Sequence, residues 1–188
     1  MSVQATLRSA AGPLPVAPHW SHIRQTLDAA QRAAMHCAIA SVSPAGEPHV
    51  TPIGTVFLGE MPGVGYFFDT YTSALGRHID ANGRVCVMAV NSSPGLWLRA
   101  LLFGRFSSPP GVRLHGTAGP LREATDAECA AIDQRTRATR RLRGHRLLWT
   151  QFTQVRDLRF THLTPVRYPV MMDGLWAASP AREAGDAP

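Results

Sequence analysis

Five polar residues, 69–73, interrupt a largely apolar part of the chain, and their types suit anion binding. The aromatic run 64–68 before them predicts a strand, and the pattern of residues 73–81 predicts a short helix. The first turn of a helix leaves backbone N–H groups without partners, and hydroxyls in this corner add further donors. A phosphate is a suitable ligand for such a corner. The alternative is an ordinary helix cap, because Ser and Thr begin helices for structural reasons alone.

Arg77 and His78 stand one helical turn beyond this corner. A side chain at this place leans back toward the helix N-terminus, so Arg77 is the candidate for a cationic partner of the phosphate. The alternative is a solvent-exposed helix face, where most helical charges lie. We expect the anion contact from Arg77 and not from His78.

A second candidate lies upstream, in the strand pattern of residues 48–58. Pro52 has no N–H to donate to a neighbouring strand, so it places the segment at a sheet edge or at a bulge. Either arrangement leaves backbone groups available beside Thr51 and Gly54, where a ligand could bind. The alternative is an edge strand that binds nothing.

The elements around these candidates are mostly strands. Strand patterns occur at 35–42, 48–58, 64–68, 84–91, 112–121 and 157–168. The run 84–91 is nearly all apolar, which predicts a strand buried on both faces. Helical patterns occur at 19–32, 73–81 and 125–142, and Thr125 and Glu128 open the last with a capping box. The order predicts a mainly β fold, a six-stranded antiparallel barrel, closed or split, with flanking helices.

One domain accounts for a chain of 188 residues. We expect it to span residues 19–176, because the Ala-, Pro- and Gly-rich ends have the composition of a flexible N-terminal arm (1–18) and a flexible C-terminal tail (177–188). Within the domain, an apolar, aromatic stretch between Ser- and Pro-rich brackets predicts an inserted flap at about 92–111. Its aromatic and Arg side chains suit either a dimer contact or an anionic ligand.

The composition excludes several kinds of chemistry. The sequence contains no lysine, so neither a Schiff-base lysine nor a phosphate-binding P-loop lysine is present. The three cysteines are too few for a disulfide framework, and the spacing of the histidines matches no metal motif, so no metal is expected. No apolar run reaches about 18 residues, which predicts no membrane span, and a reducing cytoplasm is the expected location.

The net charge of +6 suits an anionic small molecule. Arginines crowd residues 135–146, as in some nucleic-acid-binding faces. However, Asp126, Glu128 and Asp133 share the same predicted helix. We interpret the run as a solvated face with carboxylate pairing and expect no nucleic-acid partner.

Several pieces of the chain follow one another in a distinctive order. They are the hairpin CAIASVSPAGEPHVTPIGTVFL with Gly46 in its turn, the strand HVTPI, the corner FFDTYTS, the helix end Asn82-Gly83-Arg84-Val85 and the strand VRLHGTAGPL with its central Gly116. Together they resemble the pyridoxamine 5'-phosphate oxidase-like split barrels, which bind flavin mononucleotide (FMN). The resemblance covers roughly residues 30–170, and it rests on the order and spacing of the pieces rather than on any single one.

The resemblance implies a flavin-dependent oxidoreductase that acts on a small-molecule substrate. In this family the flavin lies outside the barrel, in a groove between two subunits, so the resemblance also implies a homodimer. The implied cofactor-binding residues are His49, Thr51, Pro52, Ile53 and Gly54 in the strand, and Phe68, Asp69, Thr70, Ser73 and Arg77 at the corner and helix. No catalytic residue is implied, since the redox chemistry belongs to the flavin.

The chain departs from the family at the phosphate. In members that bind FMN firmly, Arg-Lys follows the serine of the corner, whereas Ala74 and Leu75 follow Ser73 here. The charge-assisted contacts of that pair are therefore missing. Other ligands stay open as alternatives: a deazaflavin in the same groove, used by a reductase, or haem or flavin held by a non-enzymatic binding module. A barrel that has lost its cofactor is the remaining alternative.

Overall fold

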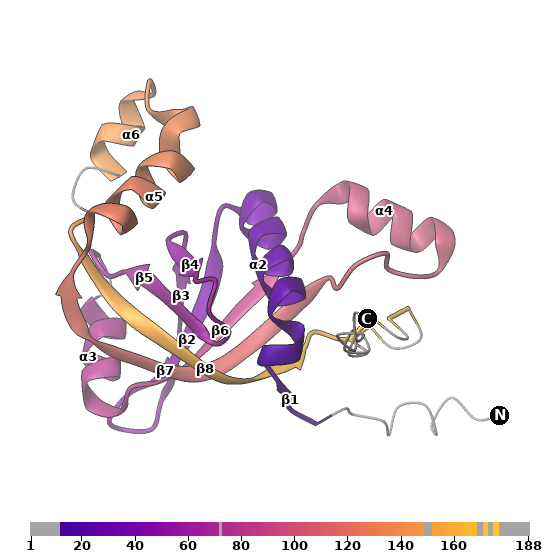
Figure 1. Cartoon of the computed structure of the whole chain (residues 1–188), viewed down its shortest axis with the longest axis horizontal. Coiled ribbons are helices and arrows are strands. Elements are labelled where there is room, and N and C mark those ends of the chain that lie inside the picture. The colour runs from indigo at the N-terminus through magenta and orange to yellow at the C-terminus, as the bar shows by residue number, and fades with distance from the viewer. Residues whose placement is uncertain (1–11, 72, 149–151, 169–170, 173–174, 177–188) are drawn as a thin grey trace, which may run out of the picture.

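The computed structural model describes residues 12–71, 73–148, 152–168, 171–172 and 175–176. Its strands form one antiparallel sheet in the order β3-β2-β6-β7-β8-β5-β4, and the short β1 pairs with β8. The strands are β1 (Leu14–Pro15), β2 (Cys37–Val42), β3 (Pro48–Ile53), β4 (Val56–Leu58), β5 (Val64–Phe68), β6 (Arg84–Val90), β7 (Gly111–Glu123) and β8 (Gln154–Pro165). The sheet curls into a half-barrel flanked by helices (Figure 1), which confirms the predicted mainly β split barrel.

Seven strands follow one another along the sheet, where six were predicted. The difference arises in residues 48–58, which divide into β3 and β4 at Gly54 and Thr55. Within the described residues, β3 pairs only with β2 and β4 only with β5, so these two strands are the edges of the split barrel. Pro52 therefore lies on an edge strand, as its missing N–H predicts.

The helices are α2 (Trp20–Ala34), α3 (Ser73–Asn82), α4 (Pro94–Phe103), α5 (Asp126–Thr136) and α6 (Arg143–Leu148), with the 3-10 turns η1 (Ala17–His19) and η2 (Arg137–Thr139). The helix predicted over 125–142 is thus interrupted by η2. Its capping box is confirmed, because the Thr125 hydroxyl accepts from the Glu128 N–H at 3.3 Å and the Glu128 carboxylate accepts from the Thr125 N–H at 2.8 Å. Among the described helices, none combines the length and the apolar character needed to cross a membrane.

The concave face of the sheet holds the main core, and α2 fills it. Ile23, Leu27 and Ala30 lie on one face of α2 because they are three and four positions apart, and all three are buried. They pack among inward-facing strand residues such as Ile39, Val87, Leu114 and Leu163. A smaller cluster of Phe68, Ile132 and Val155 fixes α5 to the far end of the sheet.

The convex face of the sheet, opposite the main core, exposes apolar side chains. Val87 of β6 points into the core, whereas Met88 is exposed. The prediction of a strand buried on both faces is therefore wrong for the single chain, since an antiparallel sheet can be covered on one side alone. The exposed Val50 of β3 pairs with Ala40 of β2, which also pairs with Cys86 of β6, so an apolar strip crosses this face.

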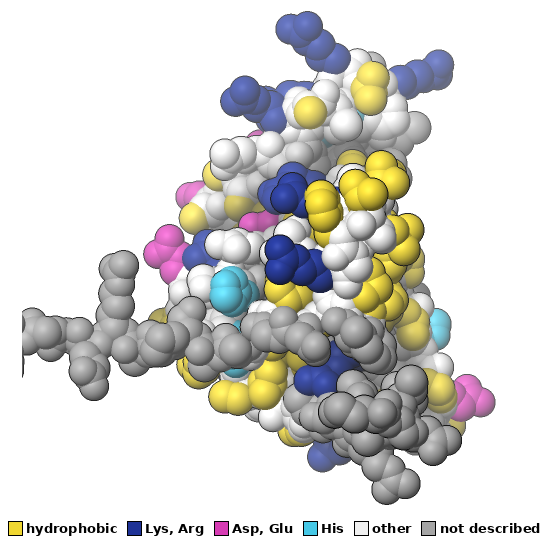
Figure 2. Space-filling model, turned by 90° about the vertical axis from the view of Figure 1, so that its right-hand side faces the viewer, with side chains coloured by type: hydrophobic (Ala, Val, Ile, Leu, Met, Phe, Trp, Pro, Cys, Tyr) yellow, Lys and Arg dark blue, Asp and Glu magenta, His cyan; other side chains and the backbone are white. Residues whose placement is uncertain are grey.

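Helix α4 lies within residues 92–111, the segment predicted as a flap, and stands away from the half-barrel (Figure 1). The indole N–H of Trp97 anchors it by donating to the Asn91 carbonyl at 2.9 Å. Its outer face carries large apolar side chains that are 62–75% exposed: Leu98, Leu101, Leu102 and Phe103. Figure 2 looks onto this side of the molecule, where hydrophobic side chains gather. An exposed apolar patch of this kind indicates an interaction surface.

The structure describes part of the predicted N-terminal arm and no residue of the predicted C-terminal tail. Leu14 and Pro15, within the predicted arm, pair with Leu163 and His162 of β8 and so belong to the sheet. Residues 1–11 of the arm, and the predicted tail, 177–188, lie outside the described residues.

Candidate functional site

The two predicted halves of the cofactor site lie side by side. Residues 49–54 comprise β3 and the residue after it, and residues 68–77 comprise the corner and the first half of α3; together we call them the β3–α3 site. At the Gly54 end, the hydroxyl of Thr55 donates to the carbonyl of Phe68 at 3.2 Å. This contact joins the end of β3 to the start of the corner across 13 residues of sequence.

His78 joins the two halves at the other end. Its ring meets the ring of His49 edge-on, with centroids 5.4 Å apart. Its Nδ1 lies 3.0 Å from the Ser41 hydroxyl of β2, and the amide of Asn82 donates to the Val42 carbonyl at 3.1 Å. His78 therefore holds α3 against the sheet, which is a positioning role that the sequence did not predict.

The strand half presents polar groups that lack partners. Thr51 is half-buried, and its hydroxyl oxygen is buried without a hydrogen-bond partner among the described residues. Pro52 is exposed beside it, whereas Ile53 is buried in the core. Because β3 is an edge strand, its outer backbone groups are available to a ligand or a second chain.

The acidic residue of the corner is neutralised by an arginine from β8. The Asp69 carboxylate accepts from Arg156 Nε at 2.6 Å, and both side chains are almost completely buried, at 7% and 4% exposure. Arg156 Nη1 also donates to Asp80 of α3 at 2.7 Å and to the Gly119 carbonyl at 3.3 Å. A carboxylate next to a phosphate site would repel the anion, and Arg156 removes that repulsion.

The same arginine ties the corner to α3. Burial lowers the pKa of Arg156, but its hydrogen bonds to Asp80 and Asp69 raise it overall, so the guanidinium stays charged. Its hydrogen bond to Asp80 lowers the pKa of that carboxyl group. Gly76 leaves room for the pair, since a Cβ there would lie 3.3 Å from both Arg156 Nη2 and Asp69 Oδ2. The alternation of buried Arg156, Leu158 and Phe160 along β8 is the sequence signal for a buried ion pair.

The phosphate end of the site is only partly described. Thr72 and the side chain of Ser73 lie outside the described residues, and Thr70 is half-buried. Arg77 is exposed on α3, where a bound anion could reach it. Leu75 is fully buried in the main core. The second position of the family's Arg-Lys pair is thus a core position in this chain, where a lysine would bury a charge.

Comparison with known proteins identifies the fold that carries this site. The sequence profile described as Pyridoxamine 5'-phosphate oxidase matches residues 23–159, which is most of the chain. The chain belongs to this family. The matched region contains β3, the corner, α3 and Arg156.

Two experimental structures have a similar fold. An FMN-binding protein from Syntrophomonas wolfei has a TM-score of 0.55 at 8% identity, over 79% of this chain and 88% of its own. HupZ from Group A Streptococcus has a TM-score of 0.51 at 12% identity, over 77% of this chain and 94% of its own. At these identities the likeness shows the fold alone. No curated protein sequence matches the chain significantly.

The residues of the β3–α3 site fit the ring of FMN better than its phosphate. An FMN ring needs backbone N–H and C=O groups beside an apolar surface, and the edge strand β3, with Pro52 and the unpartnered Thr51 hydroxyl, supplies both. The phosphate needs donors and positive charge, and the α3 N-terminus with Arg77 supplies one full charge where the Arg-Lys pair would supply two. The ring end therefore fits well, and the phosphate end fits with fewer charges.

Other candidates from the sequence lie away from this site. His115 stacks on His162 with centroids 4.6 Å apart, and burial, followed by His162 and Arg113, lowers the pKa of His115. Within the described residues, no group of three or more His, Cys, Asp or Glu side chains could hold a metal ion. In the flap, Arg99 lies 5.8 Å from the ring centroid of Phe103.

Proposed function

We propose that the protein is an FMN-binding oxidoreductase related to pyridoxamine 5'-phosphate oxidase, with a small molecule as its substrate. The observation that carries the proposal is the buried pairing of Asp69 with Arg156. It offsets the negative charge of Asp69 at the corner, where the α3 N-terminus and Arg77 can attract an anion. Without that pairing, the corner would repel a phosphate.

Each half of the β3–α3 site has a part in this function. Arg77 and the backbone N–H groups at the start of α3 bind the phosphate. Thr51 and the edge of β3 bind the polar side of the ring, and Pro52 contacts its apolar side. The bound flavin supplies the redox chemistry. The chain's own contribution is to bind the flavin and to orient it toward the substrate.

The proposal includes a homodimer, because the convex face and the flap both expose apolar surface. Val50 of the edge strand β3 and Met88 of β6 lie on the convex face, and α4 adds four exposed apolar side chains. Packing a second copy against this surface would cover it and would turn the open β3–α3 site into a groove. Light scattering at micromolar concentration should give twice the chain mass. A monomer would contradict the shared groove.

The absorption spectrum of the purified protein tests the cofactor. We expect the visible bands of an oxidised flavin, and we expect stripped protein to take up one FMN per chain in a fluorescence titration. Bleaching of the flavin bands by a chemical reductant, and their return in air, would support a redox role. A Soret band would indicate haem, and a bound deazaflavin would indicate a reductase of that class. Either result, or no FMN uptake at micromolar concentration, would contradict the proposal.

A further inference from the structure

A cavity of about 900 Å³ lies outside the β3–α3 site. It is bounded by the C-terminal part of α2, the link between β3 and β4, and the α5–η2–α6 segment. Figure 1 shows α2 and the α5–α6 pair at the same end of the half-barrel. Its volume falls in the range of about 300–1,000 Å³ that is typical of small-molecule sites.

The walls of the cavity are largely apolar. Met35 and Leu142 line it from opposite elements, although each keeps 60% or more of its surface exposed. Phe57 and Ala131 also contribute to the apolar lining. Met35 is also the only described non-glycine residue with a positive φ, at 63°. Large apolar side chains facing unfilled space favour an apolar ligand.

An arginine, Arg135, is anchored by hydrogen bonds at one side of the cavity. Arg135 Nη1 donates to the Val56 carbonyl at 2.8 Å and to the Gly54 carbonyl at 3.3 Å. Its guanidinium carbon lies 3.6 Å from the ring centroid of Phe57. These contacts use one nitrogen and one face, so Nε and Nη2 keep donors with no partner among the described residues. Such an arginine is ready to bind an anionic group.

Three further residues, Arg32, Asp28 and Gln31, add polar groups to the cavity. Arg32 is the second cation in the lining and Asp28 the one carboxylate among its described members, so the described lining is net positive. Gln31 is buried beside them, and its amide N–H donates to the Val56 carbonyl at 3.1 Å. The Gln31 carbonyl oxygen is buried without a partner among the described residues. A hydrogen-bond donor on a molecule in the cavity would satisfy this acceptor.

We propose that this cavity is a second ligand site, which binds an aromatic molecule carrying an anionic group. The aromatic body would lie against Phe57, Met35 and Leu142, and the anion would meet the unused donors of Arg135. The site is distinct from the proposed FMN site, which it meets only at Gly54. The inference therefore stands whether or not FMN binds.

A matched pair of fluorescent probes tests the site. 8-Anilinonaphthalene-1-sulfonate is an aromatic anion, and N-phenyl-1-naphthylamine is the same ring system without the sulfonate. We expect saturable binding of the sulfonate at one site per chain. Arg135→Gln should weaken the sulfonate about tenfold, the effect of losing one charge-assisted hydrogen bond, and should change the neutral probe less than twofold.

Two controls locate the effect. Arg99→Gln removes the arginine that lies beside Phe103 in the exposed flap, and it should leave both probes unchanged. Ala138→Trp fills the cavity and should abolish binding of both probes, whereas Ala127→Trp, on an exposed position of α5 outside the lining, should not. FMN uptake by Ala138→Trp should equal that of the wild type. Equal loss of both probes in Arg135→Gln, loss in Arg99→Gln, or unchanged binding in Ala138→Trp would overturn the proposal.

Discussion

Two arginines in this protein each bridge two carboxylates, and they do so at very different depths. Arg156 of β8 joins Asp69 of the corner and Asp80 of α3, with only 4% of its side chain exposed. Arg122 of β7 joins Glu128 of α5 at 2.7 Å and Asp157 of β8 at 2.6 Å, with 35% exposed. Each cluster contains one arginine and two carboxylates, but the Arg156 side chain is buried and the Arg122 side chain is partly exposed.

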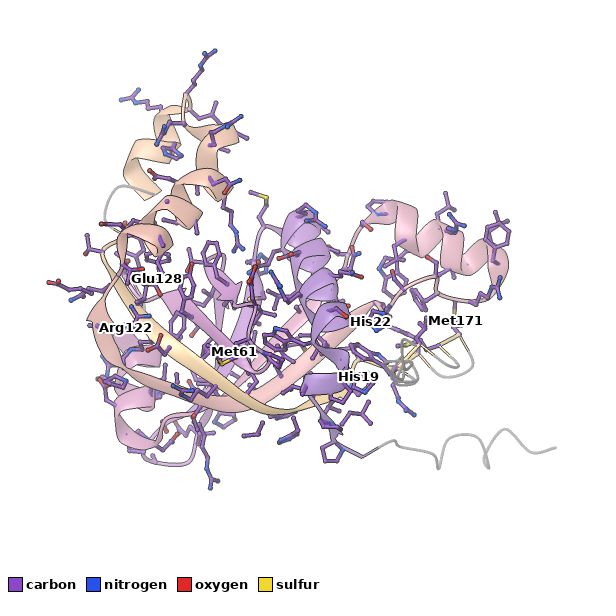
Figure 3. The ribbon with its side chains drawn as sticks, viewed as in Figure 1. His19, His22, Met61, Arg122, Glu128 and Met171 are labelled. Carbon is purple, nitrogen blue, oxygen red and sulfur yellow. The ribbon has the colours of Figure 1, made fainter. Side chains whose placement is uncertain are left out.

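The difference separates a cluster that builds the site from one that supports a helix. Arg156 and Asp69 are both buried, so water cannot readily replace the ion pair between them. Arg122 and Glu128 lie at the base of α5 (Figure 3), where water can replace either partner. Glu128 also closes the capping box, so its cluster fixes the start of α5. Burial, rather than the number of contacts, therefore decides which cluster the fold needs.

The largest expected effect is that of Arg156→Met. The change removes the arginine that neutralises the buried Asp69 carboxylate, which should lower the free energy of unfolding by about 3–5 kcal/mol. Urea unfolding followed by circular dichroism measures it. Adding Asp69→Asn to this variant should recover part of the loss, because the buried negative charge that Arg156 neutralised is then gone. A loss below about 1 kcal/mol, or no recovery in the double variant, would contradict the role given to burial.

A smaller effect is expected for the matched substitution Arg122→Met. The cluster is partly hydrated, so the free energy of unfolding should fall by only about 1 kcal/mol. The same urea experiment gives the value. A cost equal to that of Arg156→Met would show that the depth of the two clusters does not set their importance.

The smallest effect is a change in pH dependence. The hydrogen bond from Arg122, offset in part by burial, lowers the pKa of Glu128 from its ordinary value of 4.5. A folded-state pKa below the unfolded value stabilises the fold at higher pH, and that stability is lost as the pH falls through the folded value. Unfolding measured from pH 6 to about pH 3 should therefore show a loss of stability below about pH 4.5. The loss of stability with falling pH should be smaller in Arg122→Met. An unchanged pH dependence in this variant would contradict the interaction between Arg122 and Glu128.

The parts of the fold that could be predicted depend on short stretches of sequence. The capping box involves residues three positions apart, and the register shift of β7 falls at Gly116, where a Cβ would collide with the Arg159 carbonyl. The corner and α3 were also placed correctly. Each of these features follows from local backbone chemistry, which sequence patterns report directly.

The rest depends on contacts between distant segments. The partners of Arg156 lie 87 and 76 positions away, so no spacing rule pairs them. The arginine run was interpreted as a solvated face, and the ion pair of Arg140 with Asp133 at 3.3 Å fits that interpretation. Arg135 instead faces the cavity, because η2 interrupts the helix and the α5–α6 segment folds back toward α2.

The central claim is that the corner and α3 bind the phosphate of FMN, and Arg77 tests it most directly. Calorimetric titration of FMN and riboflavin into the wild type and Arg77→Ala should show FMN weakened by about 1.5–3 kcal/mol. Riboflavin, which lacks the phosphate, should lose almost nothing. Arg84→Ala, which removes an equally exposed arginine just beyond α3, should change neither ligand. Equal losses for both flavins, or none for either, would contradict a phosphate bound at this corner.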